Sequence, residues 1–239
     1  MRLYFRPFLG LTITTVISLI LLLTLGTWQY QRLQWKTDLL SEVEAASTAT
    51  PFKSFRDVTY ALDAGEPVDF RRIEFESLSM SEDPFDVFTP EKKDVSWRQF
   101  FPMKQGSYFA FVDTGLVSDA KKNQTYSRWN TPRAFAGYVR KAQPKGRFSP
   151  ESLPDDNQWF GFNHKPETHN WNDLVNGDYD MRYYIETVAG ETDADGLPAR
   201  KANLRNNHFD YMLTWYGLAF TLLVMYLIFH YKAGRLRFS

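Results

Sequence analysis

Residues 8–31 read FLGLTITTVISLILLLTLGTWQYQ, and this long run without a charged side chain decides the architecture. A second run, residues 211–231, reads YMLTWYGLAFTLLVMYLIFHY and is also uncharged when its histidine is counted as neutral. About 20 residues of helix, each rising 1.5 Å, cross the ~30 Å hydrocarbon core of a bilayer. Each run therefore predicts one membrane-spanning helix, and we place the two spans at residues 8–28 and 210–230.

The rest of the chain carries nearly all of the charge. Leu33, Leu39 and Val43 follow a helical repeat, and neither Gly nor Pro occurs between the end of the first run and Pro51. The first helix is therefore predicted to continue beyond the membrane over residues 29–46. We expect a water-soluble domain over residues 47–205 and a basic tail over residues 231–239. The first run is longer than a signal-peptide core and no small-residue cleavage site follows it closely, which predicts a retained anchor.

The soluble domain has the composition of a β structure. Aromatic and β-branched residues, alternating in places, predict strands near residues 70–76, 107–113, 134–140, 158–162 and 182–188. Turn signals separate these segments, among them Asp113-Thr114-Gly115. Residues 168–175 fit one short helix with Thr168 as N-cap. The expected fold class is a membrane protein of the α+β type, in which two transmembrane helices flank an antiparallel, β-rich, barrel-like soluble domain.

Composition excludes several functions. The 28 Lys and Arg balance 28 Asp and Glu, which gives no support to nucleic-acid binding. The lack of cysteine excludes disulfides, thiolate metal sites and cysteine nucleophiles. No nucleophile motif or phosphate-binding loop occurs, so we expect a protein that is not an enzyme. His164 and His169 lie five residues apart in a polar loop, where a metal site is one interpretation and two exposed histidines the other.

The Lys and Arg residues beside the spans predict the orientation. Lys232, Arg235 and Arg237 follow the second span, against Lys201 and Arg205 before it. Two spans place both termini on one side, which we expect to be the cytoplasm, with the soluble domain outside. A long Arg- and Ser-rich presequence is lacking, which favours a bacterial inner membrane over the mitochondrial one.

The two membrane exits, residues 25–36 and 206–219, lie at the same depth if both runs span the bilayer. On a helix, residues 208, 212 and 215 share a face, as do residues 28, 32 and 35. These side chains suit a tetrapyrrole. An imidazole can ligate its iron, aromatic rings can cover the macrocycle, and arginine guanidinium groups can pair with its propionates. The alternative is an interfacial aromatic belt with a hydrogen-bonded histidine that orients the helix. The candidate cofactor-binding residues are His208, Trp28, Gln29, Arg32, Arg205, Met212 and Trp215, with His208 as the candidate iron ligand.

These two segments resemble the paired signatures of the Surfeit-locus cytochrome oxidase assembly factors. The pattern Leu-Gly-x-Trp-Gln-x-x-Arg-x-x-x-Lys falls on Leu25, Gly26, Trp28, Gln29, Arg32 and Lys36. The pattern Asn-Asn-His followed by Tyr-x-x-x-Trp-[Phe/Tyr]-x-Leu-Ala falls on Asn206, Asn207, His208, Tyr211, Trp215, Tyr216, Leu218 and Ala219. Weaker matches lie at residues 71–72, 137–140, 159 and 183–186. The chain departs from the family at residues 113–118, where DTGLVS replaces a segment similar to Arg-Gly-Trp-Val-Pro.

The resemblance implies an assembly factor that assists insertion of haem a into the catalytic subunit of haem-copper oxidases. It implies transient binding of haem a, with His208 as the first candidate axial ligand. The expected partners are that catalytic subunit, the haem a synthesis machinery and the lipid bilayer. Two alternatives stay open: a structural or scaffolding subunit that binds no haem, and a membrane-tethered module whose β-domain binds a small ligand.

Overall fold

The computed structural model describes residues 3–80, 83–89, 95–122, 124, 126–143, 148–162, 171, 175, 177–198 and 207–238. Two compact units make up the chain. The helical unit comprises Met1–Ser41 and Ala202–Ser239, and the barrel unit comprises Glu42–Lys201.

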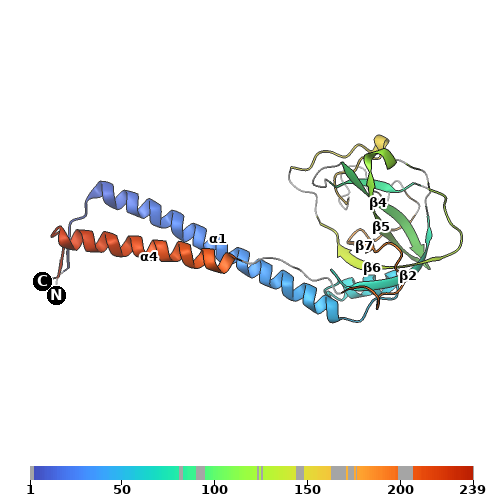
Figure 1. Cartoon of the computed structure of the whole chain (residues 1–239), viewed down its shortest axis with the longest axis horizontal. Coiled ribbons are helices and arrows are strands. Elements are labelled where there is room, and N and C mark those ends of the chain that lie inside the picture. Colours follow the sequence, from blue (N-terminus) through green and yellow to red (C-terminus); the bar gives the residue numbers. More distant parts are fainter. Residues whose placement is uncertain are drawn as a thin grey trace. The chain divides into compact units, whose positions relative to one another are not determined.

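The helical unit consists of two long antiparallel helices, α1 (Leu9–Thr48) and α4 (His208–Lys232), which lie side by side (Figure 1). The side chains that face the partner helix recur every three or four residues and include polar groups. Thr12 Oγ1 lies 2.8 Å from the hydroxyl of Tyr226, and Thr27 Oγ1 lies 3.2 Å from that of Tyr216. Interhelical hydrogen bonds of this kind hold helices together in lipid, where apolar contact alone gives little preference.

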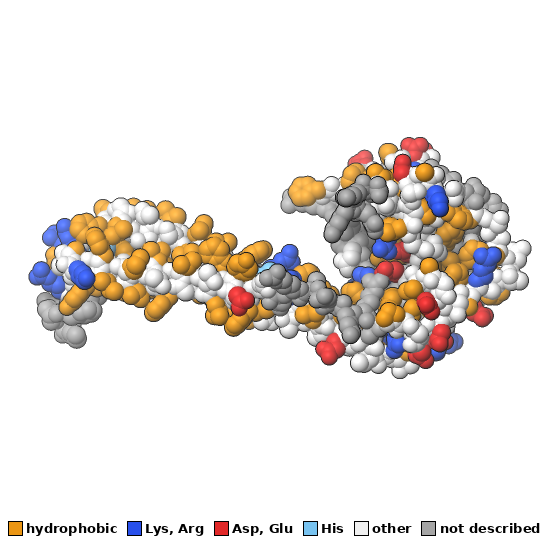
Figure 2. Space-filling model, viewed as in Figure 1, with side chains coloured by type: hydrophobic (Ala, Val, Ile, Leu, Met, Phe, Trp, Pro, Cys, Tyr) orange, Lys and Arg blue, Asp and Glu red, His pale blue; other side chains and the backbone are white. Residues whose placement is uncertain are grey.

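The outer faces of both helices are apolar and exposed (Figure 2). In the most apolar 18-residue window of each helix, 11 % of the residues are buried. A helix of this composition in a water-soluble core would be mostly buried, because exposed apolar area of this size is unfavourable in water. The predicted architecture, two membrane helices flanking a β-rich domain, is therefore confirmed.

A short antiparallel ribbon joins the two ends of the chain. Strand β1 (Leu3–Phe5) pairs with strand β8 (Leu236–Phe238), so that Tyr4 lies opposite Arg237. We call these two strands the terminal ribbon. The sequence did not predict it, since three residues at each end are too few to show a strand pattern.

The barrel unit contains a closed barrel of five strands. The strand order is β2 (Arg72–Ser79), β6 (Arg133–Lys141), β7 (Tyr183–Thr187), β5 (Tyr108–Ser118) and β4 (Ser96–Gln105), and pairing of β2 with β4 closes it. Strand β3 (Phe85–Phe88) pairs with β4 outside this ring. Two 3₁₀ turns, Asp119–Lys121 and Pro154–Asp156, lie in the connections.

One buried cluster fills the barrel and takes side chains from every barrel strand, including Ile73, Met103, Val112, Val139 and Ile185. The helix α2 (Phe55–Asp63) adds three buried side chains to this core at three-residue spacing. Its N-cap is Ser54, whose hydroxyl accepts a hydrogen bond from the Asp57 N–H at 3.1 Å. A second, aromatic cluster takes the alternate residues of β4 and β5 and therefore packs on the outside of the barrel; it includes Phe100, Phe111, Trp159 and Trp171.

Several details differ from the sequence expectations. The sheet is not wholly antiparallel, because β5 and β7 pair in parallel with Val112 opposite Ile185. Asp113-Thr114-Gly115 is not a turn but lies inside β5, where the register of the neighbouring strand shifts between Arg98 and Phe100. Gly115 has φ +120°, and its N–H donates to Asp113 Oδ1 at 2.9 Å. These turn-favouring residues therefore form an irregularity within a strand and not a turn between strands.

The segment 158–162 forms no strand, and Trp159 makes only a single bridge to Val87. Conversely, α2, β3 and β4 were not predicted. The helix expected over residues 168–175 lies outside the described residues, except for residues 171 and 175.

Candidate functional site

The membrane-exit site is formed where α4 begins beside α1. His208 is the first residue of α4, and Gln29 lies on the face of α1 that packs against it. The ring nitrogen Nδ1 of His208 lies 2.6 Å from Oε1 of Gln29, although 178 residues separate them along the chain. The structure thus brings together one residue of each of the two signature segments.

This contact determines which nitrogen of the imidazole carries the proton. An amide oxygen can only accept a hydrogen bond, so Nδ1 of His208 must donate to Gln29 Oε1. In the neutral ring, Nε2 is then left with its lone pair. Among the described residues, no hydrogen bond engages Nε2. A histidine held at Nδ1 with a free Nε2 has the arrangement of a metal-ligating imidazole that an outer hydrogen bond orients.

The other candidate residues divide between two faces. Met212 and Trp215 are half-buried on the side of α4 that carries His208, and Trp215 Nε1 is buried without a hydrogen-bond partner among the described residues. Trp28 is 49 % exposed. Arg32 is exposed, and its guanidinium lies 4.8 Å from the ring centre of Trp35. Arg205, His164 and His169 lie outside the described residues.

Gly26 explains why one signature position is a glycine. A Cβ atom at this position would lie 2.8 Å from Cε1 of Tyr216, closer than carbon atoms approach in proteins. The hydroxyl of the same tyrosine is hydrogen-bonded to Thr27. The two signatures therefore pack directly on each other, with Gly26 three residues before Gln29 on α1.

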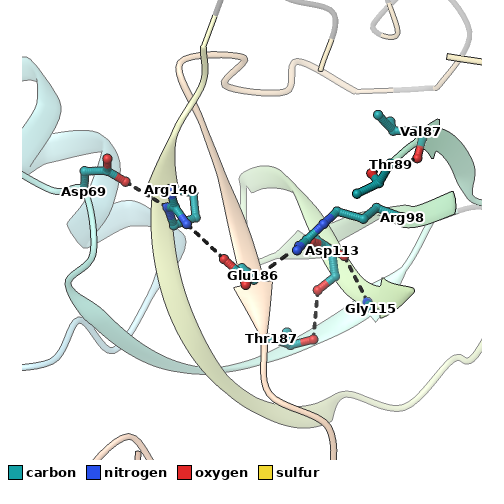
Figure 3. A network of polar contacts seen from close by, with 9 residues as sticks. All are labelled: Asp69, Val87, Thr89, Arg98, Asp113, Gly115, Arg140, Glu186 and Thr187. Atoms are coloured by element: carbon teal, nitrogen blue, oxygen red, sulfur yellow. Dashed lines mark hydrogen bonds and ion pairs between the residues drawn. The ribbon is translucent and has the colours of Figure 1, made fainter. Parts of the chain in front are cut away.

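The barrel unit contains a second polar feature that the sequence reasoning missed. Figure 3 shows a chain of ionic contacts on the outside of the barrel. Arg98 of β4 is ion-paired with Asp113 of β5 and lies 3.7 Å from Glu186 of β7. Glu186 in turn accepts from Arg140 of β6 at 3.1 Å, and Arg140 reaches Asp69 at 3.1 Å. These five residues, the barrel network, connect four of the five barrel strands.

Burial and charge oppose each other at Asp113. Its side chain is fully buried, and burial raises the pKa of this carboxyl above its ordinary value in spite of Arg98. Burial would lower the pKa of Arg98, but the charge of Asp113 and the hydrogen bond to it raise the pKa of the guanidinium. Asp113 and Glu186 are directly opposite in the parallel pair, so Arg98 offsets a repulsion between like charges.

The sequence contained partial signals for the barrel network. Arg140 and Glu186 lie within the weaker family matches, and Asp113 opens the segment where the chain departs from the family. Arg98 carried no signal. No group of three or more His, Asp or Glu side chains that could hold a metal ion occurs within the described part of the chain.

The sequence is similar to known proteins. A model of the SURF1 family matches residues 16–220, a range that includes both signatures and the whole barrel unit. A SURF1-like protein of Rickettsia bellii is 22% identical over 232 residues, which cover 91% of this chain and 89% of the relative. Surfeit locus protein 1 of Mus musculus is 22% identical over 232 residues, covering 81% and 67%. A SURF1-like protein of Caenorhabditis elegans is 21% identical over 234 residues, covering 85% and 69%. The chain belongs to the SURF1 family.

Proposed function

We propose that this protein is a cytochrome oxidase assembly factor of the inner membrane that assists insertion of haem a into the catalytic subunit. It holds haem a transiently at the membrane exit of its two helices, with His208 Nε2 as the iron ligand. The family membership supports the assembly role. The contact between Gln29 and His208 carries the haem-binding part, because it orients the ring and leaves Nε2 available.

The residues around His208 fit a carrier. A haem-binding protein that must hand over its cargo needs a ligand but not a closed cavity, and His208 is only half-buried. Met212 and Trp215 would supply apolar contact beside the ring on α4. Arg32 is exposed and lies one turn beyond Gln29, where a guanidinium could pair with a propionate. Bound haem a would supply the iron that His208 ligates, and this chain would supply orientation and release.

The test is the absorbance spectrum of the full-length protein, purified in mild detergent after co-expression with haem a synthesis enzymes. We expect a Soret band in the wild type and its loss in His208→Ala. We expect Gln29→Leu to keep the ligand but to weaken haem binding about 10–100-fold, because the outer hydrogen bond is lost.

The matched control is the double variant His164→Ala/His169→Ala, which removes two imidazoles and leaves both signatures unchanged. It should bind haem a like the wild type. Wild-type binding by His208→Ala would contradict the ligand assignment. Stoichiometric co-purification of wild type with the oxidase and no Soret band would favour the structural-subunit alternative.

The barrel offers less support for a small-ligand module. A surface hollow of about 380 Å³ is lined by Lys53, Glu74, Glu76 and Gln105, among others. Lys53 and Glu74 are ion-paired with each other there. Two charged groups of its lining are thus already partnered with each other, which leaves fewer groups there to bind a ligand.

A further inference from the structure

The terminal ribbon fixes the two chain ends against each other. Arg6 N–H donates to the carbonyl of Arg235 at 2.9 Å, and the strand register sets Tyr4 opposite Arg237. The tight turn before β8 contains Gly234 with φ +68°, a conformation that favours glycine. Residues from the two ends of the sequence are therefore held in one small structure, not in two free tails.

A buried histidine attaches the terminal ribbon to the helix pair. The His230 ring is fully buried, and its Nε2 accepts from the N–H of Phe8 at 3.2 Å. Its Nδ1 lies 2.9 Å from the carbonyl oxygen of Tyr226 and must donate to it, because a carbonyl only accepts. One neutral imidazole thus links the start of α1 to the end of α4, directly beside the ribbon.

Four basic side chains gather at this end of the helical unit, which we call the terminal patch: Arg6, Lys232, Arg235 and Arg237. Figure 2 shows blue side chains grouped at the end where both termini lie. Three of the four are exposed, and Arg235 lies over the ring of Phe8 at 4.7 Å. The sequence has no Asp or Glu before Asp38 or after Asp210, so no acidic side chain of these two segments offsets the charge.

Exposed aromatic rings accompany the terminal patch. Tyr4, Phe5, Phe8 and Tyr231 are 48%, 42%, 39% and 63% exposed. Tyrosine rings at the ends of membrane helices lie at headgroup depth, where the apolar ring and the polar hydroxyl of Tyr4 and Tyr231 are both accommodated. The terminal patch is therefore placed where phospholipid phosphates lie, and guanidinium forks match phosphate oxygens in charge and geometry.

We propose that the terminal patch binds the phosphate headgroups of anionic phospholipids in the adjoining leaflet. The occupant is a lipid and not a soluble phosphate, because the neighbouring exposed rings fit a bilayer interface. This binding does not depend on the haem-carrier function. It would hold the chain ends in the leaflet that is richer in anionic lipid.

The test is lipid selectivity of the full-length protein reconstituted in phosphatidylcholine bilayers, measured by electron spin resonance. The motionally restricted fraction of spin-labelled phosphatidylglycerol is compared with that of spin-labelled phosphatidylcholine. We expect a several-fold preference for phosphatidylglycerol that weakens at high salt. The variant Arg6→Gln/Lys232→Gln/Arg235→Gln/Arg237→Gln should show almost no preference, whichever way the chain is inserted.

Two controls keep the result interpretable. Arg6→Lys/Arg235→Lys/Arg237→Lys keeps the charge and should keep most of the preference. A second control removes four exposed basic side chains of the barrel unit, Arg56, Lys121, Arg128 and Lys141, and should leave the preference unchanged. An unchanged preference after neutralisation of the terminal patch would overturn the proposal. So would displacement of the labelled lipid by inorganic phosphate, but not by chloride, at matched ionic strength.

Discussion

At the scale of single residues, hydrogen bonding dominates at the membrane-exit site, whereas burial of a charged group dominates in the barrel network. Gln29 and His208 each satisfy the other's hydrogen bond within a largely apolar helix pair. Asp113 also has partners, Arg98 and the Gly115 N–H. Burial nevertheless raises the pKa of Asp113 by more than these partners lower it. A buried ion pair of this kind need not stabilise the fold, because desolvation of the carboxylate can exceed the attraction of its partner.

The sign of the pH dependence follows from the raised pKa of Asp113. The native state holds this proton more tightly than the unfolded chain. The contribution of Asp113 to stability is therefore fully present below its ordinary pKa of about 4, and it falls as the pH rises through the raised native pKa. We expect the free energy of unfolding of wild type minus that of Asp113→Asn to decrease from acid to neutral pH.

Thermal unfolding of the full-length protein in detergent, followed by near-ultraviolet circular dichroism at several pH values, measures this difference. Glu76→Gln serves as the control for loss of an exposed carboxylate on β2. A difference that grows toward neutral pH would mean that the attraction of Arg98 exceeds the desolvation of Asp113.

At the scale of elements, two neighbouring barrel strands, β6 and β7, lie so close that one position has no room for a side chain. Gly137 of β6 lies opposite Thr187 of β7. A Cβ atom at this glycine would lie 2.3 Å from the carbonyl oxygen of Glu186 and 2.8 Å from Thr187 Cα. Backbone atoms cannot rotate away as a side chain can, so an alanine there must displace a strand.

We therefore expect Gly137→Ala to destabilise the barrel by about 1–3 kcal/mol, in the range of overpacked cores. Gly196→Ala is the matched control, since the nearest atom to its added Cβ would be 3.6 Å away. The thermal midpoint of the full-length protein reports both variants. Equal midpoints for the two would show that β6 and β7 are less closely paired than this register requires.

At the scale of the whole molecule, the remaining question is which side of the membrane holds the barrel unit. We propose that both termini are cytoplasmic, because the terminal patch carries the excess of Lys and Arg. The chain has no cysteine, so a single introduced cysteine is a clean reporter. Phe148 of the barrel unit is 95% exposed, and Tyr4 of the terminal ribbon is 48% exposed.

In intact bacterial cells, a membrane-impermeant maleimide should label Phe148→Cys without lysis. Tyr4→Cys should react only after the cells are opened. The reverse pattern would place the barrel unit in the cytoplasm. The His208 site would then lie at the cytoplasmic face of the inner membrane and not at its outer face.

The sequence by itself determined those helices and strands that depend mainly on residues close together along the chain. Charge-free runs of sufficient length predict membrane helices wherever the rest of the chain lies. The segments that became β2, β5, β6 and β7 were recognised from side-chain pattern, although their bounds shifted. Strand β4 was missed because it contains Pro102 and Arg98, which interrupt a strand pattern. Strand β3 is only four residues long and gives too short a pattern.

Only the tertiary structure decided which distant residues meet. The parallel pairing of β5 with β7, the barrel network and the terminal ribbon all join segments far apart in sequence. The signatures placed Gln29 and His208 at one depth, but only helix packing set them 2.6 Å apart and turned Trp28 to an exposed face. Side-chain pattern reports the local environment of a residue, whereas its partner depends on how the whole chain packs.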